Sequence, residues 1–545
     1  MKCIPLRLFL LLILVYSISL VSCGQQVKTH KPVDSLAQDM DKTIPGNFTQ
    51  HSTDVFDSTS LTPFFKKYPG LKTYAGQVTD FYQKRKYAYA WFENGSLIEQ
   101  AGNLTNRIMN LDNDGIYKKA PYAKSLDSLL DGLNTKTTSK QPLTDVELML
   151  TSQYFMLANL IWHGMGADAS KSAKWFLPRE KDSYDQYLDS LLKTPTKQLT
   201  NEPVYRQYEL LRTYLKKYRD LDSSDKWALI TIAGKSVKSG DSSSTILLIK
   251  KRLYKLGDYK GDTITNVFTA ELVSGVKQFQ TRLGLPVNGL VNRETINEMN
   301  VPLKSRIKQI LVNMERSRWL PASMKGDYLG VNIPEFKLHV YNNDSLLWSC
   351  NVVVGKSANQ TTVFYGEVKY VVFSPYWNVP ESIVRNEVIP GMRKNANYIS
   401  KHNMQITGYV NGLPSVRQKP GPENSLGLVK FLFPNSYSIY LHDTPSKSLF
   451  GESARAFSHG CIRVKEPAKL ADFLLQQRKE WTPQKIDAAM HAGKEQYVTL
   501  NNKIPVFIAY LTAFVDRDGK INFRKDIYSL DGRLADMLMK QNGAY

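Results

Sequence analysis

Hydrophobic residues at helical spacing dominate the first part of the chain. After Thr144-Asp145-Val146-Glu147, which has the pattern of a helix capping box, apolar side chains recur every three or four residues until Gly164. A second apolar stripe follows the helix start Thr200-Asn201-Glu202-Pro203, and it consists of Val204, Tyr208, Leu211, Leu215 and Tyr218. Residues 48–235 are therefore predicted to form a mostly helical scaffold domain, in which no residue stands out as catalytic.

The same region is rich in aromatic side chains, which could either pack in a core or form a sugar-binding platform. We expect core packing, because buried aromatic rings contribute much of the apolar area of helical domains. The side chains concerned are Tyr87, Tyr89, Trp91, Phe92, Tyr154, Phe155 and Trp162.

A compact helical module is predicted over residues 241–301. Its first helix begins at Thr245, and its second helix carries a buried stripe and ends at Gly284. Phe279-Gln280 and the Gly-rich turn after this helix resemble the small three-helix kind of peptidoglycan-binding domain. The resemblance implies recognition of the cell wall, although such a module can also serve merely as a spacer.

The periodicity changes from helix to strand after Pro321. Short β-branched and aromatic runs at 329–333, 337–341, 346–354 and 368–373 predict a sheet-rich domain over residues 325–545. Mixed helix and loop at about 382–434 interrupts the strands, and an insertion of this length usually covers a site or confers specificity. Strand pairing resumes at 438–441, which places His442 at a strand end.

The N-terminus indicates export. Lys2 and Arg7 precede an apolar run of signal-peptide length, so residues 1–22 are predicted to be a signal peptide. Leu20-Val21-Ser22-Cys23-Gly24 resembles a bacterial lipobox, in which Cys23 is lipidated, and residues 23–47 would then be a tether. We therefore expect a protein of the cell envelope or periplasm, anchored to a membrane through Cys23. An ordinary signal peptide or an uncleaved anchor is the alternative.

Charge and cysteine content narrow the possible partners. The formal net charge of +21 favours anionic surroundings, such as lipid headgroups and wall carboxylates, or simply aids solubility. Nucleic acid is not expected, since no basic cluster is joined to a recognisable binding motif. Of the four cysteines only Cys350 and Cys461 fall in the expected mature body, so we predict no disulfide framework. Cys350 lies in a strand-like run and is expected to be a buried thiol.

The segment Ser458-His459-Gly460-Cys461-Ile462-Arg463, with His442 before it, can form an acyl-transfer site. A thiol needs a nearby imidazole to take its proton and backbone N–H groups to hold the oxyanion. Gly460 lets the backbone turn tightly, and Arg463 offers a planar fork for a substrate carboxylate or braces the loop. His442 or His459 could be the base. The two histidines and Cys461 could instead bind zinc, but a further ligand is not evident.

Several segments of residues 325–545 together resemble the YkuD-type L,D-transpeptidases of bacterial cell walls, and the domain order resembles their long multidomain branch. These segments are Tyr376-Trp377-Asn378-Val379-Pro380, Asn424-Ser425-Leu426-Gly427, Phe433-Pro434-Asn435, Leu441-His442-Asp443-Thr444, the Ser458 to Arg463 motif and Phe523-Arg524-Lys525-Asp526-Ile527-Tyr528. The resemblance implies a multidomain α+β protein with a helical scaffold, a peptidoglycan-binding module and a β-sandwich-like catalytic domain that carries an inserted cap.

The resemblance also implies a reaction and roles for individual residues. Cys461 would attack the third residue of a donor stem peptide, release D-alanine and pass the acyl group to an amine of a second stem in a 3→3 cross-link, with no cofactor or metal. His442 would be the base, oriented by the carbonyl of Asp443. The N–H groups of His459, Gly460 and Cys461 would hold the oxyanion. Binding or orienting roles fall to Arg463, Asp443, Ser458, Trp377 and Asn378.

Two other functions stay open. With water as the acceptor, the same cysteine would make the protein a stem-peptide hydrolase. A wall-tethering lipoprotein without chemistry would need only the anchor and the first half of the chain. Capture of a carbapenem on Cys461 is predicted if the acyl-transfer interpretation holds.

Overall fold

The computed structural model describes residues 54–133, 141–179, 184–193 and 202–542. The expected signal peptide, Cys23 and the tether lie outside these residues. Within them, no helix combines the length and the apolar character that crossing a membrane requires.

The first part of the described chain is helical, as predicted, and its aromatic side chains form a core. All the aromatic residues named above are buried except Tyr87, which packs against the cluster half-buried. Core packing is therefore confirmed over a sugar-binding platform for this set. The helices are α3 (Leu61–Lys67), α4 (Ala75–Lys84), α5 (Glu99–Met109), α6 (Ala123–Leu133), α7 (Gln141–Ala158), α8 (Ala167–Ser172), α9 (Tyr184–Lys193) and α10 (Gln207–Ser224).

The predicted capping box at the start of α7 is wrong. The helix begins at Gln141, so Glu147 lies inside it and is fully buried. Its carboxylate accepts hydrogen bonds from the Tyr82 hydroxyl at 2.7 Å and from the N–H groups of Ala90 and Trp91 at 2.5 and 3.1 Å. Burial raises the pKa of Glu147 to about 7. The Glu147 carboxylate, which the sequence pattern assigns to a local helix cap, thus bonds to residues that are distant in the sequence.

The start of α10 also differs from the prediction, while its apolar stripe is confirmed. The five stripe residues are buried, but the helix begins at Gln207, later than Pro203. Thr200 and Asn201 lie outside the described residues. Glu202 is not a helix-start residue, because its carboxylate accepts from the guanidinium of Arg107 at 2.9 and 3.0 Å and from the Trp162 indole at 2.6 Å.

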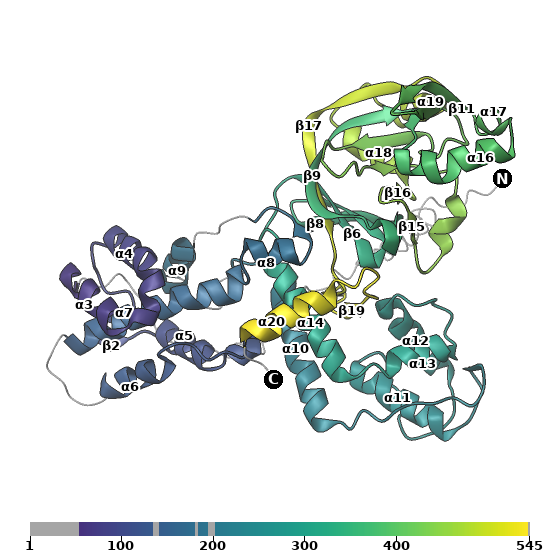
Figure 1. Cartoon of the computed structure of the whole chain (residues 1–545). Coiled ribbons are helices and arrows are strands. Elements are labelled where there is room, and N and C mark those ends of the chain that lie inside the picture. The colour runs from purple at the N-terminus through teal and green to yellow at the C-terminus, as the bar shows by residue number, and fades with distance from the viewer. Residues whose placement is uncertain (1–53, 134–140, 180–183, 194–201, 543–545) are drawn as a thin grey trace, which may run out of the picture. The chain divides into compact units, whose positions relative to one another are not determined.

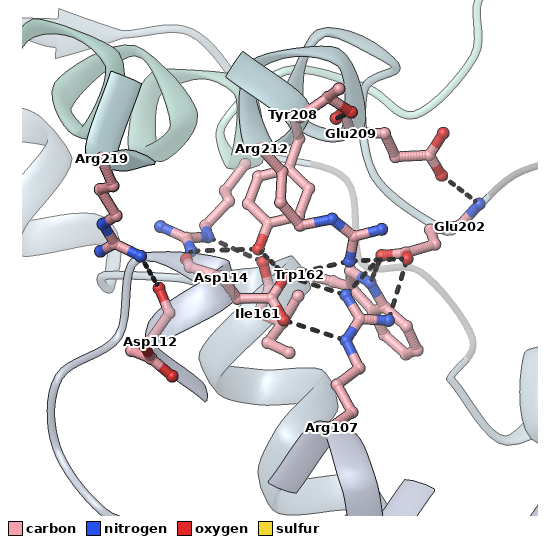
Figure 2. Close-up of polar contacts among 12 residues, drawn as sticks. Arg107, Asp112, Asp114, Ile161, Trp162, Glu202, Tyr208, Glu209, Arg212 and Arg219 are labelled. Carbon is pink, nitrogen blue, oxygen red and sulfur yellow. Dashed lines mark hydrogen bonds and ion pairs between the residues drawn. The ribbon is translucent and has the colours of Figure 1, made fainter. Parts of the chain in front are cut away.

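Glu202 belongs to a largely buried polar network, in which Figure 2 shows it with Arg107, Asp114 and Arg212. The network also reaches the next long helix, α14 (Leu303–Arg318). Asp114 accepts hydrogen bonds from Arg107 at 3.0 and 3.1 Å, from Arg212 at 3.1 Å and from the Tyr208 hydroxyl at 2.7 Å. Arg318 at the end of α14 donates to the carbonyls of Ile161 and Asp114 at 2.7 and 3.2 Å. The network therefore fixes the end of α14 on the scaffold.

The helical module after the scaffold matches its prediction. It contains α11 (Ser244–Leu256), α12 (Ala270–Leu283) and α13 (Arg293–Met299). Gly284 ends α12 in the left-handed conformation, with φ of 67°, as the sequence indicates. The side chains of Leu272, Val276, Phe279 and Leu283 are buried.

The sheet-rich domain is built on one sheet that closes on itself. The pairing order is β13-β14-β16-β8-β7-β6-β17-β9, and β13 also pairs with β9, which completes a ring. Figure 1 shows β6, β8, β9, β16 and β17 of this sheet. The strands are β6 (Asp327–Asn332), β7 (Lys337–Asn342), β8 (Ser345–Gly355), β9 (Val363–Phe373), β13 (Val429–Leu432), β14 (Leu441–His442), β16 (Ile462–Val464) and β17 (Gln496–Ala509). The strand runs predicted between 329 and 373 are confirmed, and the expected multidomain α+β architecture with them. The strand expected at 438–441 is wrong, because Ser438 has a positive φ of 55° and β14 begins only at Leu441.

The segment between β9 and β13 forms the cap. Its three-stranded sheet has the order β10-β12-β11, made of β10 (Trp377–Asn378), β12 (Leu413–Gln418) and β11 (Met404–Val410). Short helices α15 (Glu381–Ile383), α16 (Ile389–Lys394) and α17 (Tyr398–Lys401) accompany it, and a small apolar core lies among them. The end of the expected insertion at 382–434 returns to the closed sheet, because β13 is one of its strands.

Two short segments cross the expected domain limits. Strand β3 (Trp175–Phe176), from the scaffold region, pairs in parallel with β9 of the closed sheet. The hairpin β18 (Ala513–Val515) and β19 (Ile521–Phe523) packs in the apolar core of the helices. The chain ends with α20 (Asp531–Asn542), which contacts α14. Scaffold and sheet domain are thus joined by packing as well as by the chain.

We predict that Asp114→Asn lowers the free energy of unfolding by about 3–5 kcal/mol, because it leaves buried guanidinium groups without their counter-charge. Burial alone would raise the pKa of Asp114, but the charges of Arg107 and Arg212 hold it well below its usual value. The loss should therefore be complete at neutral pH and shrink as the pH falls below the ordinary aspartate range. Urea unfolding followed by tryptophan fluorescence measures it.

The matched control is Glu381→Gln, which removes a carboxylate that pairs with Arg385 at 2.6 Å while both side chains are exposed. A cost of at most about 1 kcal/mol is expected there. Equal effects of the two substitutions would contradict the assignment of the network as a structural tie.

Candidate active site

The parallel pairing of β14 with β16 sets the positions of the reactive side chains. Leu441 lies opposite Ile462, and His442 lies opposite Arg463. Leu441 and Ile462 are fully buried in the core of the sheet domain. Because side chains alternate along a strand, His442 and Arg463 belong to the other face. Tyr440 and Cys461 directly precede the two strands and interact with each other, and the charge of Arg463 acts on both Cys461 and His442. The structure therefore brings together three residues that the sequence singled out and adds Tyr440, which it did not.

Cys461 lies on a tight turn between β15 (Ala456–Ser458) and β16. The Ser458 hydroxyl accepts from the Gly460 N–H at 3.1 Å and donates to the Cys461 carbonyl at 2.5 Å. Gly460 has φ of 120°, in the region that favours glycine. Ser458 is buried, so it shapes the turn that presents the cysteine.

A second set of residues stabilises the turn at Gly460 through hydrogen bonds. The Thr361 hydroxyl donates to the Gly460 carbonyl at 2.8 Å and accepts from the Gly355 N–H at 2.9 Å. The Tyr528 hydroxyl donates to the Gly355 carbonyl at 2.5 Å. A side chain at Gly355 would meet the Asn359 carbonyl oxygen at 2.1 Å, so only glycine fits. No sequence pattern pointed to Thr361 or Gly355, although Tyr528 falls in one of the segments that resemble L,D-transpeptidases.

The expected oxyanion donors differ in availability. The Gly460 N–H is engaged by Ser458. The N–H groups of His459 and Cys461 have no acceptor in the part of the chain that the structure describes. These two groups can therefore hold a developing negative charge without first breaking an internal bond.

His442 is buried and held by main-chain groups. Its Nδ1 lies 2.5 Å from the carbonyl oxygen of Asp443. Burial and the positive charge of Arg463 lower the pKa of His442 to about 3, against the opposing effect of the backbone of Asp443 and Leu426. The imidazole is consequently neutral at physiological pH. With Nδ1–H donated to the carbonyl, Nε2 carries the free lone pair.

The carboxylate of Asp443 has partners other than His442. It accepts from the Leu428 N–H at 2.9 Å and pairs with Lys447. The geometry therefore agrees with the expectation that the Asp443 carbonyl, and not its carboxylate, orients His442. The carboxylate holds the chain on which β13 begins.

The Cys461 thiol rests as a neutral group. It donates to the carbonyl oxygen of Ser438 at 3.6 Å, and Ser438 has a positive φ of 55°. Burial raises the pKa of Cys461, while hydrogen bonds from Tyr440 and the charge of Arg463 act in the opposite direction. Burial and the nearby thiol also raise the pKa of Tyr440. Thiol, phenol and imidazole are thus all uncharged around the nucleophile.

Arg463 is the cationic group of this face. Its Nε is buried and has no hydrogen-bond partner in the described residues. Burial lowers its pKa, and its charge acts on both His442 and Cys461. A planar guanidinium with unused donors beside Cys461 can bind a carboxylate group.

The remaining predicted residues lie toward the cap. Nε2 of His459 is 3.5 Å from the carboxylate of Glu387, which belongs to the cap. Trp377 and Asn378 form β10, paired with Gln418 and Arg417 in the cap sheet, and Trp377 packs against the cap core. The structure thus assigns these three to the cap and its contact with the turn, whereas the charge of Arg463 acts on both His442 and Cys461.

The two cysteines of the described chain are both free. Cys350 is buried in β8, and burial raises its pKa to about 11. It is the inert thiol that the strand-like run predicts. Within the described residues, no three His, Cys, Asp or Glu side chains gather as a metal-ligand set.

Three family models match separate parts of the chain. Residues 326–488 match the "L,D-transpeptidase catalytic domain", residues 76–215 match the "Scaffold domain", and residues 242–299 match the "Putative peptidoglycan binding domain". These ranges fall within the three predicted domains. Among curated proteins, the chain is 34% identical over 263 residues to a Haemophilus influenzae protein described as "Putative L,D-transpeptidase", which covers 44% of this chain. The chain spans about half of that relative, 53% of its length.

Solved structures of L,D-transpeptidases are also similar to parts of the chain. One from Stackebrandtia nassauensis is 14% identical and covers 53% of this chain and 100% of its own, with a TM-score of 0.21. One from Xylanimonas cellulosilytica is 13% identical and covers 51% and 100%, with a TM-score of 0.18. The catalytic domain from E. faecium acylated by ertapenem is 13% identical and covers 34% and 98%, with a TM-score of 0.17. These TM-scores are too low to support an argument about the fold. The fold described above rests on the strand pairing of this chain alone.

We predict that the rate of alkylation of Cys461 by iodoacetamide rises with pH through and beyond the ordinary thiol range of about 8.5, because burial raises its pKa and His442 is already neutral. Mass spectrometry of the labelled protein between about pH 5 and 10 measures the rate. Cys461→Ala is the control, since the buried Cys350 should label only slowly. A plateau reached below neutral pH would show a resting thiolate–imidazolium pair and contradict the prediction.

Proposed function

Because the chain carries an L,D-transpeptidase catalytic domain, we propose that it forms 3→3 cross-links between peptidoglycan stem peptides through a thioester on Cys461. The observation that supports this most directly is that His442 lies opposite Arg463 across the β14–β16 pair, while the charge of Arg463 also acts on Cys461. It supplies a nucleophile, a neutral base and a carboxylate-binding cation within one register.

In the acylation step the thiol leaves the Ser438 carbonyl, to which it donates in the structure, and turns toward His442. Nε2 of His442 takes the thiol proton as Sγ attacks the carbonyl of the third stem residue. The N–H groups of Cys461 and His459 hold the oxyanion. The intermediate collapses with cleavage of the amide, and His442 returns the proton to the amine of the departing D-alanine. A thioester on Cys461 remains.

The second step regenerates the enzyme. The side-chain amine of a second stem attacks the thioester carbonyl and loses a proton to His442. The C–S bond breaks, the acyl group ends on the amine as a new amide, and the thiolate recovers its proton. Water in place of the amine would give a tripeptide and make the protein a hydrolase.

Arg463 has a defined place in this scheme. The donor ends in the carboxylate of its terminal D-alanine, next to the amide that Cys461 cleaves. A guanidinium with unused donors beside Cys461 can bind that carboxylate and thereby set the distance between the thiol and the scissile carbonyl. Such a role would favour donors that keep a free terminal carboxylate.

The other parts of the chain fit a protein that works at the cell wall. The module at 242–299 would hold peptidoglycan near the catalytic domain. Lipidation of Cys23 and export by residues 1–22 remain proposals that rest on the N-terminal sequence. Anchored in this way, the protein would meet its substrate in the cell envelope.

We predict that the full chain, incubated with a disaccharide-tetrapeptide, yields a cross-linked dimer that has lost one alanine. Mass spectrometry of the products identifies it. Tripeptide alone would show that water is the acceptor, and unchanged substrate would leave only a tethering role. Cys461→Ala is expected to abolish product formation, because no other described thiol is accessible.

The choice of base can be tested by acylation with a carbapenem, which we propose as a covalent ligand of Cys461 because a solved L,D-transpeptidase is acylated by ertapenem. His442→Ala should slow the appearance of the adduct mass by about 10²–10⁴-fold, as expected for loss of a general base. His459→Ala should have a much smaller effect, since this ring faces Glu387 of the cap. A near-normal rate for His442→Ala combined with a large loss for His459→Ala would reverse the assignment.

A further inference from the structure

A strand from the scaffold region forms part of the surface beside the active site. Exposure alternates strictly along residues 173–177, with Ala173, Trp175 and Leu177 buried and the two residues between them exposed. Trp175 packs on Trp319 in the core of the sheet domain, with ring centroids 5.8 Å apart. β3 pairs with β9 so that Phe176 lies opposite Phe364. The scaffold thus places one exposed aromatic ring on the edge of the closed sheet.

Tyr437 completes an aromatic surface with these rings. Its ring centroid lies 4.9 Å from that of Phe364 and 6.0 Å from that of Phe176, and its plane is tilted by 33° to the Phe176 ring. Phe364 is buried, whereas Phe176 and Tyr437 are 41% and 40% exposed. We call Phe176, Phe364 and Tyr437 the aromatic shelf.

The aromatic shelf is directly connected to the nucleophile. Tyr437 precedes Ser438, whose carbonyl oxygen accepts the Cys461 thiol at 3.6 Å. Asn435 holds this loop, because its amide donates to the carbonyls of Phe433 and Ile439 at 2.6 and 2.8 Å and its oxygen accepts from the Tyr437 N–H at 3.0 Å. The aromatic shelf therefore shares a held loop with the carbonyl group that contacts the thiol.

The same scaffold strand also contacts the segment that contains Thr361, which stabilises the turn before Cys461. Nζ of the exposed Lys174 lies 3.5 Å from the side-chain oxygen of Gln360. The next residue, Thr361, bonds to the Gly460 carbonyl. Lys174 and Phe176 are thus the scaffold residues that flank the site, one polar and one aromatic.

We propose that the aromatic shelf binds a sugar ring of the glycan to which the donor stem peptide is attached. This inference rests on the proposed function, because it takes the stem peptide as the donor. Exposed aromatic side chains held rigidly beside a reactive site mark a binding surface, and flat rings offer their faces to the C–H groups of a pyranose. Lys174 adds a donor for the hydroxyl or amide oxygens of such a ring.

The reach of the substrate agrees with this placement. The carbonyl that Cys461 attacks belongs to the third residue of the stem, and three extended residues span about 10 Å. Tyr437 is one residue from the group that holds the thiol, so a sugar at the N-terminal end of the stem falls within range of the aromatic shelf. The scaffold would then select donors that are still attached to glycan over free peptides.

The test compares two donors in the full chain, a disaccharide-tetrapeptide and the same tetrapeptide without sugar. The readout is the ratio of their kcat/KM values for thioester formation on Cys461, followed by mass spectrometry. Phe176→Leu and Tyr437→Leu, which keep apolar volume and remove the aromatic face, are expected to lower this ratio about five- to tenfold. Tyr497→Leu, at an exposed tyrosine of β17, is the matched control and should leave the ratio unchanged.

An unchanged ratio in both shelf variants, including an equal loss on the two donors, would overturn the proposal, since a structural role affects both alike. If the wild-type chain forms no thioester with either donor, the proposed function itself fails. Binding of the disaccharide-peptide to Cys461→Ala, with and without Phe176→Leu, then tests the aromatic shelf alone. Equal affinity of the two proteins would rule it out, and a five- to tenfold weaker affinity would support it.

Discussion

The parallel register of β14 with β16 is the constraint on which the site depends. These strands are short, yet the burial of Leu441 and Ile462 fixes which face each neighbouring side chain occupies. If the pairing shifted by one residue, the polar neighbours of Leu441 and Ile462 would turn into the apolar core, and these two aliphatic side chains would become exposed. The hydrophobic core therefore specifies the chemistry indirectly, by excluding every register except the one that gathers the reactive groups.

The same burial sets the electrostatic state of the resting site. His442 is kept neutral by burial and by Arg463, and burial also disfavours the thiolate of Cys461. In the proposed reaction the proton moves only when the substrate is in place, so that the negative charge would develop near the N–H groups of His459 and Cys461. The bracing of the turn by Ser458 and Thr361 means that little reorganisation is needed at that moment.

The scaffold contributes to the site through packing. The buried network around Asp114 and Arg318 fixes α14, the helix that leads into the first strand of the closed sheet. From the same scaffold, β3 adds Phe176 to the edge of that sheet. A helical domain thereby contributes an exposed aromatic side chain to the surface of the catalytic domain, and this is the surface that we propose for glycan binding.

The sequence by itself determined most of the elements and the candidate reactive residues. Local periodicity was sufficient for the stripe at Tyr208 and Leu215, for the end of α12 at Gly284 and for the strands around Cys350, because these features depend on neighbours along the chain. The Ser458 to Arg463 motif and His442 could likewise be recognised from the sequence as a candidate acyl-transfer site. Spacing alone identified the turn, since Gly460 adopts the conformation that its position indicates.

Only the tertiary structure decided which partners these side chains use. The local sequence around Glu147 and Glu202 predicts helix starts. In the structure both carboxylates instead accept hydrogen bonds from distant segments, Glu147 from the N–H of Ala90 and Glu202 from Arg107. Tyr440 became part of the site through strand register, and Phe176 through a pairing between segments far apart in the sequence. Local patterns report on neighbours within a few residues, whereas burial and hydrogen bonding between distant segments are settled when the chain packs. For that reason the sequence identified Cys461 and His442 as candidate site residues, and the packed fold determined the surroundings of their side chains.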